Sequence, residues 1–558
     1  MKRLFWLWMA LGAAVMTGWT APSVTVNQSG AGDFKTIQEA VNSGATLITI
    51  TDSANYVENV EIGDPDTGGP AVTLTSNQTG DQRPVITPAA VKTYDEVHRS
   101  GTDRGAGFGL FANNSVISNL IIEGHPDLDT GSGLGLGALF VMADNVVIQN
   151  CLFRPHAGTA HFIEFPNTLL FFAQQGTGGV TVSGGRDCNG CVVRDCEFTG
   201  VATDAAVVEP TIDAPGYLER KGDKDGGYAQ SAGYTRMDHY SDGRDVTISF
   251  ENCYFHHNWD YGIFPSNRGT GGGSLNILVK GCRFDANGKF AIRSRGANVN
   301  VECCVFTRVC QGRRGDDRNA AVSIMKQDSH SCSAQVKNCL FVNCGSANYQ
   351  QGYMGGVNNS DADAMTVDHC TFVSCLNGAC AGEADRGAGA NYQTGFASIS
   401  ISNSIFHQIG YNTPPAVDMD GITLTADHPD LQNGLYPAWD FGQANFGTNK
   451  WSAVFNRFHD NDAMIMINNC LVGDIASEDS RPWDEALADD ITGCRLYCGF
   501  DYNFEGAATV TRGTPVFVNT DPDAPNPFEL AANSPGQGMG ADFSTCRGTT
   551  ITNWSVFE

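Results

Sequence analysis

Apolar and polar positions alternate along this chain in a short pattern that keeps returning: an apolar residue, a spacer, a polar residue, Cys, a spacer and Phe. Such alternation is typical of a strand with one face inside, and the Asn or Gly before Cys suits a left-handed bend between two strands. The clear copies are VIQNCLF, VVRDCEF, SFENCYF, LVKGCRF, NVECCVF, QVKNCLF, TVDHCTF and SISNSIF, which end at Phe153, Phe198, Phe255, Phe284, Phe306, Phe341, Phe372 and Phe406. VISNLII near Leu120 and MINNCLV near Cys470 are weaker copies.

The spacing of these copies is variable. Cys253, Cys282, Cys304, Cys339 and Cys370 follow one another at intervals of 29, 22, 35 and 31 residues. A variable period of this size indicates stacked units with loops inserted at fixed corners. Stacking puts Cys over Cys, Phe over Phe and Asn over Asn, because a slip of one residue would invert every side chain. We therefore expect one inward column of small apolar side chains, not joined by disulfides, at Cys151, Cys196, Cys253, Cys282, Cys304, Cys339 and Cys370.

The pattern resembles the right-handed parallel β-helix of the pectin-lyase-like superfamily, over roughly Asp33 to Asp542. The resemblance implies an all-β fold, a single-stranded parallel solenoid with an N-terminal capping helix. The segment GDFKTIQEAVNSGATLITI looks like that cap, with a helix over Asp33–Ser43 that turns Phe34, Ile37, Ala40 and Val41 to the open end of the core. Residues of about 513–542 resemble the closing segment of secreted bacterial β-helices.

Within that superfamily, several activities lack their signatures here. GDFKTIQEAVN also opens pectin methylesterases, but the later Asp motifs of those enzymes are missing from this sequence. Polygalacturonases carry Gly-His-Gly and Arg-Ile-Lys, and neither tripeptide occurs here. The predicted fold therefore does not identify the activity, because this scaffold hosts many activities.

The N-terminus begins MKRLFWLWMALGAAVMTGWTAPS, with basic residues ahead of a short apolar run. We expect a signal peptide over residues 1–21, a single β-helix domain over 22–558, and a secreted, periplasmic or cell-surface protein. No later stretch is apolar and long enough for a membrane span. The formal net charge of -27 argues against nucleic acid as a partner.

Against this acidic background, Lys280–Lys326 forms a basic island with ten basic and four acidic residues. Aligning CYFHHNWDYGIFPSNRG with CRFDANGKFAIRSRG on their Cys stacks Asp260 on Lys289 and Ser266 on Arg295 without a gap. By strand alternation, Arg293 and Arg295 share one face. A solvated basic face that balances an acidic neighbouring turn is the alternative reading.

The segment NGKFAIRSRG loosely resembles the strand that carries a Lys base and an Arg acid in alginate- and dermatan-cleaving β-helix lyases, although here the Lys precedes the strand and two Arg lie within it. Elimination across a uronate removes the proton at C5, beside a carboxylate that must be neutralised. Lys289 is the candidate base, since Lys loses its proton far more readily than Arg. Arg293 and Arg295 would clamp carboxylates, and Asp260 would orient Lys289.

Other candidates surround this site. Arg313, Arg314 and Arg318 could wall a groove, His256 and His257 follow at a corner, and Tyr349 and Tyr392 recur in ANYQQGY and ANYQTGF as sugar platforms. Ca²⁺ is a candidate cofactor, for which Asp238, Asp242 and Asp245 offer oxygen ligands. Outside the repeat, Cys188 with Cys191 and Cys494 with Cys498 are candidates for a disulfide or a metal site.

Three functions remain open from the sequence. The first is a polysaccharide lyase of pectate or alginate type, which cleaves an anionic, uronate-containing polysaccharide by β-elimination. The second is a non-catalytic surface or adhesive β-helix. The third is a glycoside hydrolase that uses carboxylates such as Asp260 and Asp204.

Overall fold

A two-residue corner shapes every coil between β9 (Val116–Ser118) and β34 (Ile405–His407). Its first residue has a positive φ, as at Asn150 (53°), Asn252 (51°) and Asn338 (57°), and its second points inward. Asn tolerates this left-handed backbone better than most residues, so the Asn-Cys dipeptide turns the chain sharply from one sheet into the next. The expected bend before each Cys is confirmed, and so are the weak copies at Leu120 and Cys470.

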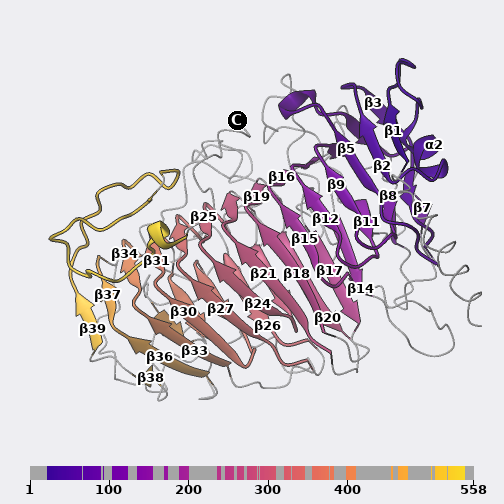
Figure 1. The fold of residues 1–558 in the computed structure, drawn as a ribbon. Helices are drawn as coiled ribbons and strands as arrows, with labels where there is room; N and C mark the ends of the chain where they lie inside the picture. The colour runs from indigo at the N-terminus through magenta and orange to yellow at the C-terminus, as the bar shows by residue number, and fades with distance from the viewer. Residues whose placement is uncertain are drawn as a thin grey trace, which may run out of the picture.

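The computed structural model describes residues 22–65, 67–89, 92–93, 104–123, 135–154, 169–173, 188–199, 235–240, 245–256, 261–268, 273–285, 287, 290–309, 320–327, 330–345, 355–375, 377–381, 397–409, 454–456, 463–474, 504–505, 509–524 and 526–546. Among these residues, three long sheets of parallel strands run the length of the molecule, and the coils stack from α2 at one end to β39 at the other (Figure 1).

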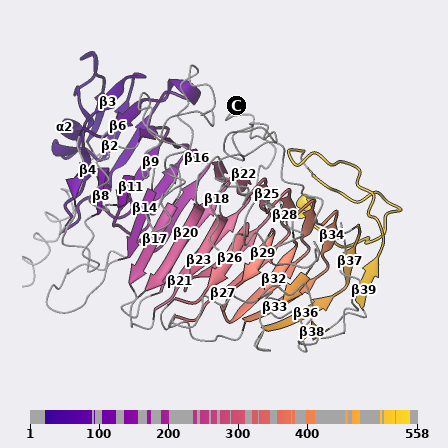
Figure 2. The same cartoon turned by 180° about the vertical axis from the view of Figure 1, so that it is seen from behind.

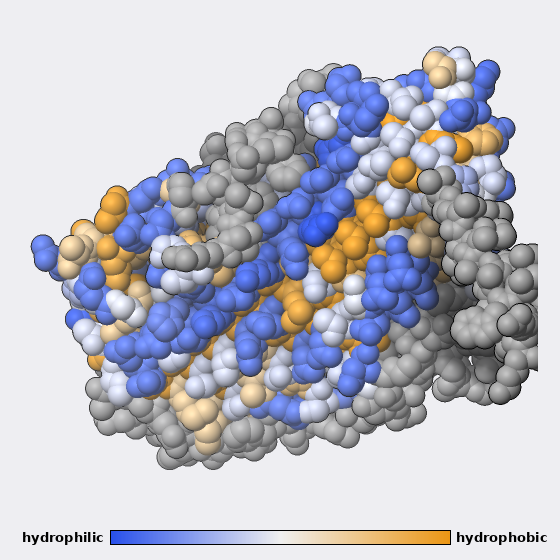
Figure 3. Space-filling model, in the orientation of Figure 1, coloured by the Kyte–Doolittle hydropathy of each residue, from blue (hydrophilic) through white to orange (hydrophobic). Residues whose placement is uncertain are grey.

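The first sheet, sheet A, faces the viewer in Figure 1 and has 14 strands. Its members are β1 (Ser23–Val26), β2 (Leu47–Ile50), β5 (Thr73–Ser76), β9, β12 (Val147–Gln149), β15 (Cys191–Arg194), β18 (Val246–Glu251), β21 (Leu275–Lys280), β24 (Asn298–Glu302), β27 (Ser333–Lys337), β30 (Ala364–Asp368), β33 (Ala397–Ser402), β36 (Ala463–Asn468) and β38 (Phe504–Glu505). Strands such as β27 alternate buried and exposed residues, and hydrophilic side chains cover much of this face (Figure 3).

Sheet B follows the corner and has 13 strands. Its members are β3 (Asn55–Val57), β6 (Val85–Thr87), β10 (Ile121–Glu123), β13 (Leu152–Arg154), β16 (Glu197–Thr199), β19 (Tyr254–His256), β22 (Arg283–Asp285), β25 (Val305–Thr307), β28 (Leu340–Val342), β31 (Thr371–Val373), β34, β37 (Cys470–Val472) and β39 (Val510–Arg512).

Sheet C completes each coil and faces the viewer in Figure 2, which shows the molecule from behind. Its members are β4 (Val60–Ile62), β8 (Arg104–Leu110), β11 (Gly135–Val141), β14 (Leu169–Ala173), β17 (Thr235–Tyr240), β20 (Tyr261–Arg268), β23 (Phe290–Arg295), β26 (Val322–Met325), β29 (Val357–Asn359), β32 (Ala379–Ala381) and β35 (Val454–Asn456), with β7 (Lys92–Thr93) antiparallel to β8. The recurring order A, B, C with parallel pairing confirms the right-handed parallel β-helix.

Like stacks on like inside the coils. The inward Phe rings of sheet B, from Phe153 to Phe406, are stacked with centroids 4.6 to 5.0 Å apart and nearly parallel planes. The expected Cys column is also confirmed: its thiols are buried and free. Burial raises the pKa of the Cys253 and Cys370 thiols and keeps these two neutral.

The helix near the N-terminus is shorter than the sequence predicts. Helix α2 spans Ile37–Asn42, with the Thr36 side chain accepting from the Glu39 amide as N-cap. Residues before it are not helical, because the Asp33 carboxylate accepts from the Thr25 amide at 2.8 Å and ties this segment to β1. Helix α2 contacts β1, β2 and β4 and buries Ile37 and Ala40. Its role as a cap for the core stays a prediction.

Residues 513–546, which we term the strap, follow β39 and include the 3₁₀ turn η6 (Phe543–Thr545); another such turn, η1, spans Gly80–Gln82. Within the strap, Phe517 and Leu530 form an antiparallel bridge, and Cys546 forms a disulfide with Cys303. The residues assigned to the signal peptide lie outside the described part of the chain. In that part, no helix combines the length and apolar character needed to cross a bilayer.

Candidate functional site

Sheet C is the face whose connections vary in length. The A-to-B corner keeps its two residues from β9 to β34, whereas the chain from sheet B to sheet C measures four residues after β19 and 35 residues after β16. Insertions next to a rigid sheet are where solenoids and barrels place binding residues. The outer face of sheet C is therefore the first place to look for a site.

Strand β23 lies between β20 and β26 on this sheet. Ile263 pairs with Ile292 and Ser266 pairs with Arg295, which confirms that part of the gapless alignment. Ile292 packs in the core, so by alternation Arg293 and Arg295 project from the outer face. The predicted sharing of one face by the two guanidinium groups is correct.

Both arginines rest against aromatic rings of the same face. The Arg293 Cζ lies 4.8 Å from the centroid of Phe290, and the Arg295 Cζ lies 5.4 Å from that of Phe264. The two Phe rings form an apolar pair separate from the coil interior. A cation over a ring gains roughly 0.5–2 kcal/mol, more when it is desolvated. This packing orients the guanidinium groups along the sheet.

Accessibility separates the two arginines. Arg293 is 1% exposed, whereas Arg295 is partly exposed. Arg293 neighbours Ser323 on β26, and Arg295 neighbours Met325. Of this pair, Arg295 is the one that can meet a ligand from solvent, and Arg293 is part of the support beneath it.

The rest of the described basic island is neutralised by carboxylates. Lys280 lies 3.8 Å from Glu302, and Lys326 lies 2.9 Å from Asp363. Arg283 pairs with Asp523 of the strap, and Arg308 pairs with Asp285. These four residues therefore fit the alternative reading of a balanced basic face.

His256 lies on sheet B and not with the arginines of sheet C. Its Nε2 is 2.9 Å from Oε1 of Glu197, and its ring stacks on Tyr254 with centroids 4.3 Å apart. The Arg283 Cζ lies 5.5 Å from the same Tyr254 ring. Burial raises the pKa of Tyr254, which keeps the phenol neutral. His256 and the two arginines thus lie on different sheets, and a role of His256 in substrate binding stays a prediction.

Asp285, next to His256 on sheet B, is a buried carboxylate. It accepts from Nε of Arg308 at 2.9 Å and from the Thr307 hydroxyl at 2.6 Å. Burial alone would raise the pKa of Asp285, but the guanidinium and the hydroxyl outweigh it and hold the pKa below its usual value. This carboxylate is thus ionised and fully engaged, so its role is structural.

The Ca²⁺ candidates are not tested as a set. The Asp245 carboxylate accepts from the amide and hydroxyl of Ser274 at 2.9 and 2.6 Å. Asp238 belongs to β17, where it pairs with Ser266 in register, and Asp242 lies outside the described residues. Across the described ranges, no group of three or more His, Cys, Asp or Glu side chains is arranged to hold a metal ion.

Several other predicted site residues lie outside the described residues: Asp260, Lys289, His257, Arg313, Arg314, Arg318, Tyr349, Tyr392 and Asp204, together with Cys494 and Cys498. No disulfide joins Cys188 to Cys191, so the disulfide part of that prediction is wrong. Their thiols donate separately to the carbonyls of Val141 and Ala143, both at 3.2 Å, because Cys191 begins β15 and points into the core.

Sequence reasoning missed the disulfide between Cys303 and Cys546. A signal was present: Cys303 occupies the corner position, with φ 57°, where other coils carry Asn, Asp, Gly or His. Because the left-handed backbone at this position favours Asn, a Cys there indicates a role for its side chain, such as a disulfide. The partner could not be found from spacing, since 243 residues separate the two.

Comparisons with known proteins do not identify an activity for this chain. No protein-family model matches this sequence, and no curated protein matches it. Among solved structures, the Agl-KA catalytic domain is 11% identical over 85% of this chain, with a TM-score of 0.44, and the match spans 64% of that domain. A PL6 alginate lyase bound to a trisaccharide is 11% identical over 88% of this chain and 90% of its own, with a TM-score of 0.33.

A third structure, PfbA, a surface adhesin of Streptococcus pneumoniae, is 10% identical over 67% of this chain and 84% of its own, with a TM-score of 0.33. At 10 to 11% identity and TM-scores of 0.33 to 0.44, these likenesses leave the activity open. The order and parallel pairing of its own strands define this chain as a right-handed parallel β-helix, and its function has to be argued from its own residues.

Proposed function

We propose that this protein is a secreted, carbohydrate-active β-helix that binds an anionic, uronate-containing polysaccharide on the outer face of sheet C and cleaves it by β-elimination. The observation that supports this most is the outward pair Arg293 and Arg295, held against Phe290 and Phe264 on the sheet with variable connections. The export signal in the sequence would deliver the protein to such a polymer.

The chemistry needs a cation at the carboxylate. Loss of the C5 proton leaves negative charge beside the uronate carboxylate, and a guanidinium placed there lowers the cost of that charge. Arg295, partly exposed and oriented by the Phe264 ring, is suited to bind one carboxylate with two hydrogen bonds. Lys289, just before the same strand, is the proposed base, with Asp260 on the preceding coil as its proposed partner.

A panel of alginate, pectate and glycosaminoglycans tests this proposal. Each polymer is incubated with purified protein while the absorbance of the unsaturated uronate product is recorded. The expected result is a rise with at least one polymer, and a smaller or absent rise with Arg295→Ala under the same conditions. No rise with any uronate polymer, while a neutral glucan is hydrolysed, would reject the elimination.

A non-catalytic binding protein is the second candidate. The 1% exposure of Arg293 favours this function. A guanidinium that solvent barely reaches stabilises the binding surface but does not contact a reacting sugar. Binding of polyuronate that falls with salt, with no unsaturated product over long incubation, would identify this function.

A further inference from the structure

The strap runs back over the solenoid it has just left. After β39, residues 516–524 and 526–531 fold as a hairpin, in which the Val518 amide donates to Glu529 O and the Ala531 amide donates to Val516 O, both at 2.8 Å. The remaining residues return across sheet B and end at Cys546, which is joined to Cys303 beside β25. In Figure 1 the strap is the yellow ribbon beyond β34, β37 and β39.

The strap contacts successive coils in reverse order. The Gly540 amide donates to Asn403 O at 2.7 Å, and the Ala541 amide donates to the Thr371 hydroxyl at 2.9 Å. One coil further back, Asn338 accepts from the Asp542 amide at 2.7 Å.

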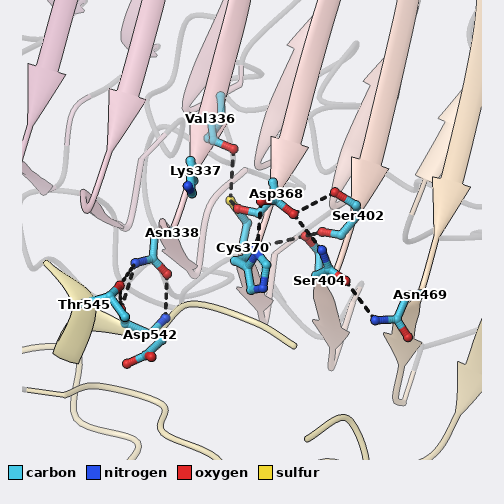
Figure 4. Close-up of polar contacts among 12 residues, drawn as sticks. Val336, Lys337, Asn338, Asp368, Cys370, Ser402, Ser404, Asn469, Asp542 and Thr545 are labelled. Carbon is cyan, nitrogen blue, oxygen red and sulfur yellow. Dashed lines mark hydrogen bonds and ion pairs between the residues drawn. The ribbon is translucent and has the colours of Figure 1, made fainter. Parts of the chain in front are cut away.

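Asn338 also holds the strap through its side-chain amide. Its Nδ2 donates to Asp542 O and to the Thr545 hydroxyl, both at 2.8 Å (Figure 4). The next coil back carries Cys303 at the same corner position, where the disulfide forms. The strap is therefore attached to four consecutive coils, and the last attachment is covalent.

Beneath the strap, sheet B has an apolar outer face. Val305, Leu340, Val342 and Val373 cluster there with Phe528 and Phe543 of the strap. On the three coils before β25 the corresponding outer positions are polar, with Glu197, Tyr254 and Arg283 in register with Val305. Apolar residues thus replace polar ones where the strap lies, and removing the strap would expose them to water.

The non-covalent hold on the strap is small compared with that on a coil. It includes the hydrogen bonds above, a hydrogen bond from the Gly513 amide to Val472 O, the contact between Asp523 and Arg283, the Phe517 ring 6.0 Å from that of His407, and one apolar cluster. Each inner coil, in contrast, is paired on both sides along three sheets. Elements with few buried contacts open locally at low free-energy cost. The bond between Cys303 and Cys546 is the one covalent tie among the described residues.

We propose that this disulfide is a redox latch: oxidised, it keeps the strap docked on sheet B, and reduced, it releases the strap and exposes the apolar face while the coils remain folded. Closing the latch joins two thiols and passes two electrons and two protons to a disulfide oxidant of an oxidising compartment. Opening is exchange with a dithiol, which becomes a disulfide as Cys303 and Cys546 regain their protons.

The arrangement of the other thiols makes the latch selective. The fourteen remaining cysteines of the described residues are buried, and those of the column lie within the coils. Burial keeps such thiols out of reach of exchange. Cys303 and Cys546 are also buried, so a reductant reaches their bond when the strap opens locally. A mild reductant acting on the folded protein therefore meets a single bond in this part of the chain.

Hydrogen exchange followed by mass spectrometry tests the proposal on the full mature chain. Exchange of the peptide that contains Gly540, Ala541 and Asp542 is compared in the oxidised protein, after dithiothreitol and after re-oxidation, with alkylation to verify that Cys303 and Cys546 are reduced. We expect at least about tenfold faster exchange on reduction, reversed on re-oxidation. Peptides of β27 and β30 should keep their slow exchange.

Two variants separate the bond from the reductant. Cys546→Ser, and independently Cys303→Ser, should show the fast exchange without reductant and no further change with it. Unchanged protection of the strap after verified reduction would overturn the proposal, since the non-covalent contacts would then suffice. Loss of protection in β27 and β30 together with the strap would also overturn it, since the disulfide would then be a brace for the whole fold.

Discussion

The guanidinium of Arg308 donates to both carboxylate oxygens of Asp285, from Nε to Oδ1 at 2.9 Å and from Nη2 to Oδ2 at 2.5 Å. Arg308 directly follows β25, the strand of the next coil that pairs with the Asp285 strand β22. Asp285 is buried and its pKa is lowered, so the pair stabilises the fold at pH values above the ordinary Asp pKa of about 3.9. That contribution is lost as the pH falls through the folded-state pKa.

Arg308→Gln should therefore destabilise the protein at pH 7 by about 1–3 kcal/mol and move acid unfolding to higher pH, because the pKa of Asp285 would rise. Gln keeps a similar length and the same Cβ at a corner residue with φ 52°. Denaturant titrations between pH 3 and 7 check this. Lys280→Ala is the matched control: its contact with Glu302 is 3.8 Å and well exposed, so it should change stability by less than about 0.5 kcal/mol. Equal acid curves for Arg308→Gln and the parent would contradict the assignment.

The Phe column predicts a graded cost of truncation. Phe306 lies between Phe284 and Phe341 with no exposed surface, at centroid distances of 5.0 and 4.7 Å. Phe306→Ala should cost about 3–5 kcal/mol by leaving a cavity, and Phe306→Leu less than about half of that. Urea unfolding measures both. Val57→Ala, at a site 62% exposed, should have little effect, and a similar loss there would mean that the assay reports something other than core packing.

The corner predicts a preference for Gly over Ala. Asn252 has φ 51°, and its side-chain amide lies 3.3 Å from Oδ1 of Asp195 on the preceding corner. Asn252→Ala should be less stable than Asn252→Gly by about 1 kcal/mol, since only Gly adopts this conformation without strain. Thermal melts of the two variants give the comparison. The opposite order would show that the corner relaxes out of the left-handed region.

The two arginines of β23 should respond differently to substitution. Arg295→Ala should weaken binding of uronate oligomers by about 1.5–3 kcal/mol with the fold intact, as expected for a lost charge-assisted contact. Arg293→Ala should lower the melting temperature instead, because its guanidinium is 1% exposed and packs on Phe290. Calorimetry of binding and thermal unfolding separate the effects, with Arg295→Lys as the variant that keeps the charge. Binding that is indifferent to Arg295 would remove it from the site.

The corner, the Cys column and the Phe column could be predicted from the sequence because each depends on residues within one short repeat. Their partners are the same residues one coil away, so periodicity supplies the long-range contact. The sequence places the start of α2 too early, because the repeat pattern contains no information on a local contact: the Asp33 carboxylate accepts hydrogen bonds from Thr25 and holds this segment extended.

The candidate site was less predictable. The outward direction of Arg293 and Arg295 follows from alternation, but the burial of Arg293 depends on what packs over sheet C, which the repeat does not encode. The separation of His256 from the arginines depends on the sheet to which each strand belongs. The pairing of Cys303 with Cys546 depends on where a non-repeating segment comes to rest.

The length of the strap also limits the number of coils that it can cross. It starts at β39 and must reach the corner at Cys303, so its length matches the number of coils between them. A coil duplicated on the N-terminal side of β24 would leave this reach unchanged, because the two-residue corner accepts another coil in register. A coil added between β25 and β39 would move Cys303 about 4.8 Å further away, beyond what the same strap can span without giving up its other contacts. The length of the strap thus fixes the number of coils between β25 and β39. The number of coils before β24 remains free to increase by duplication.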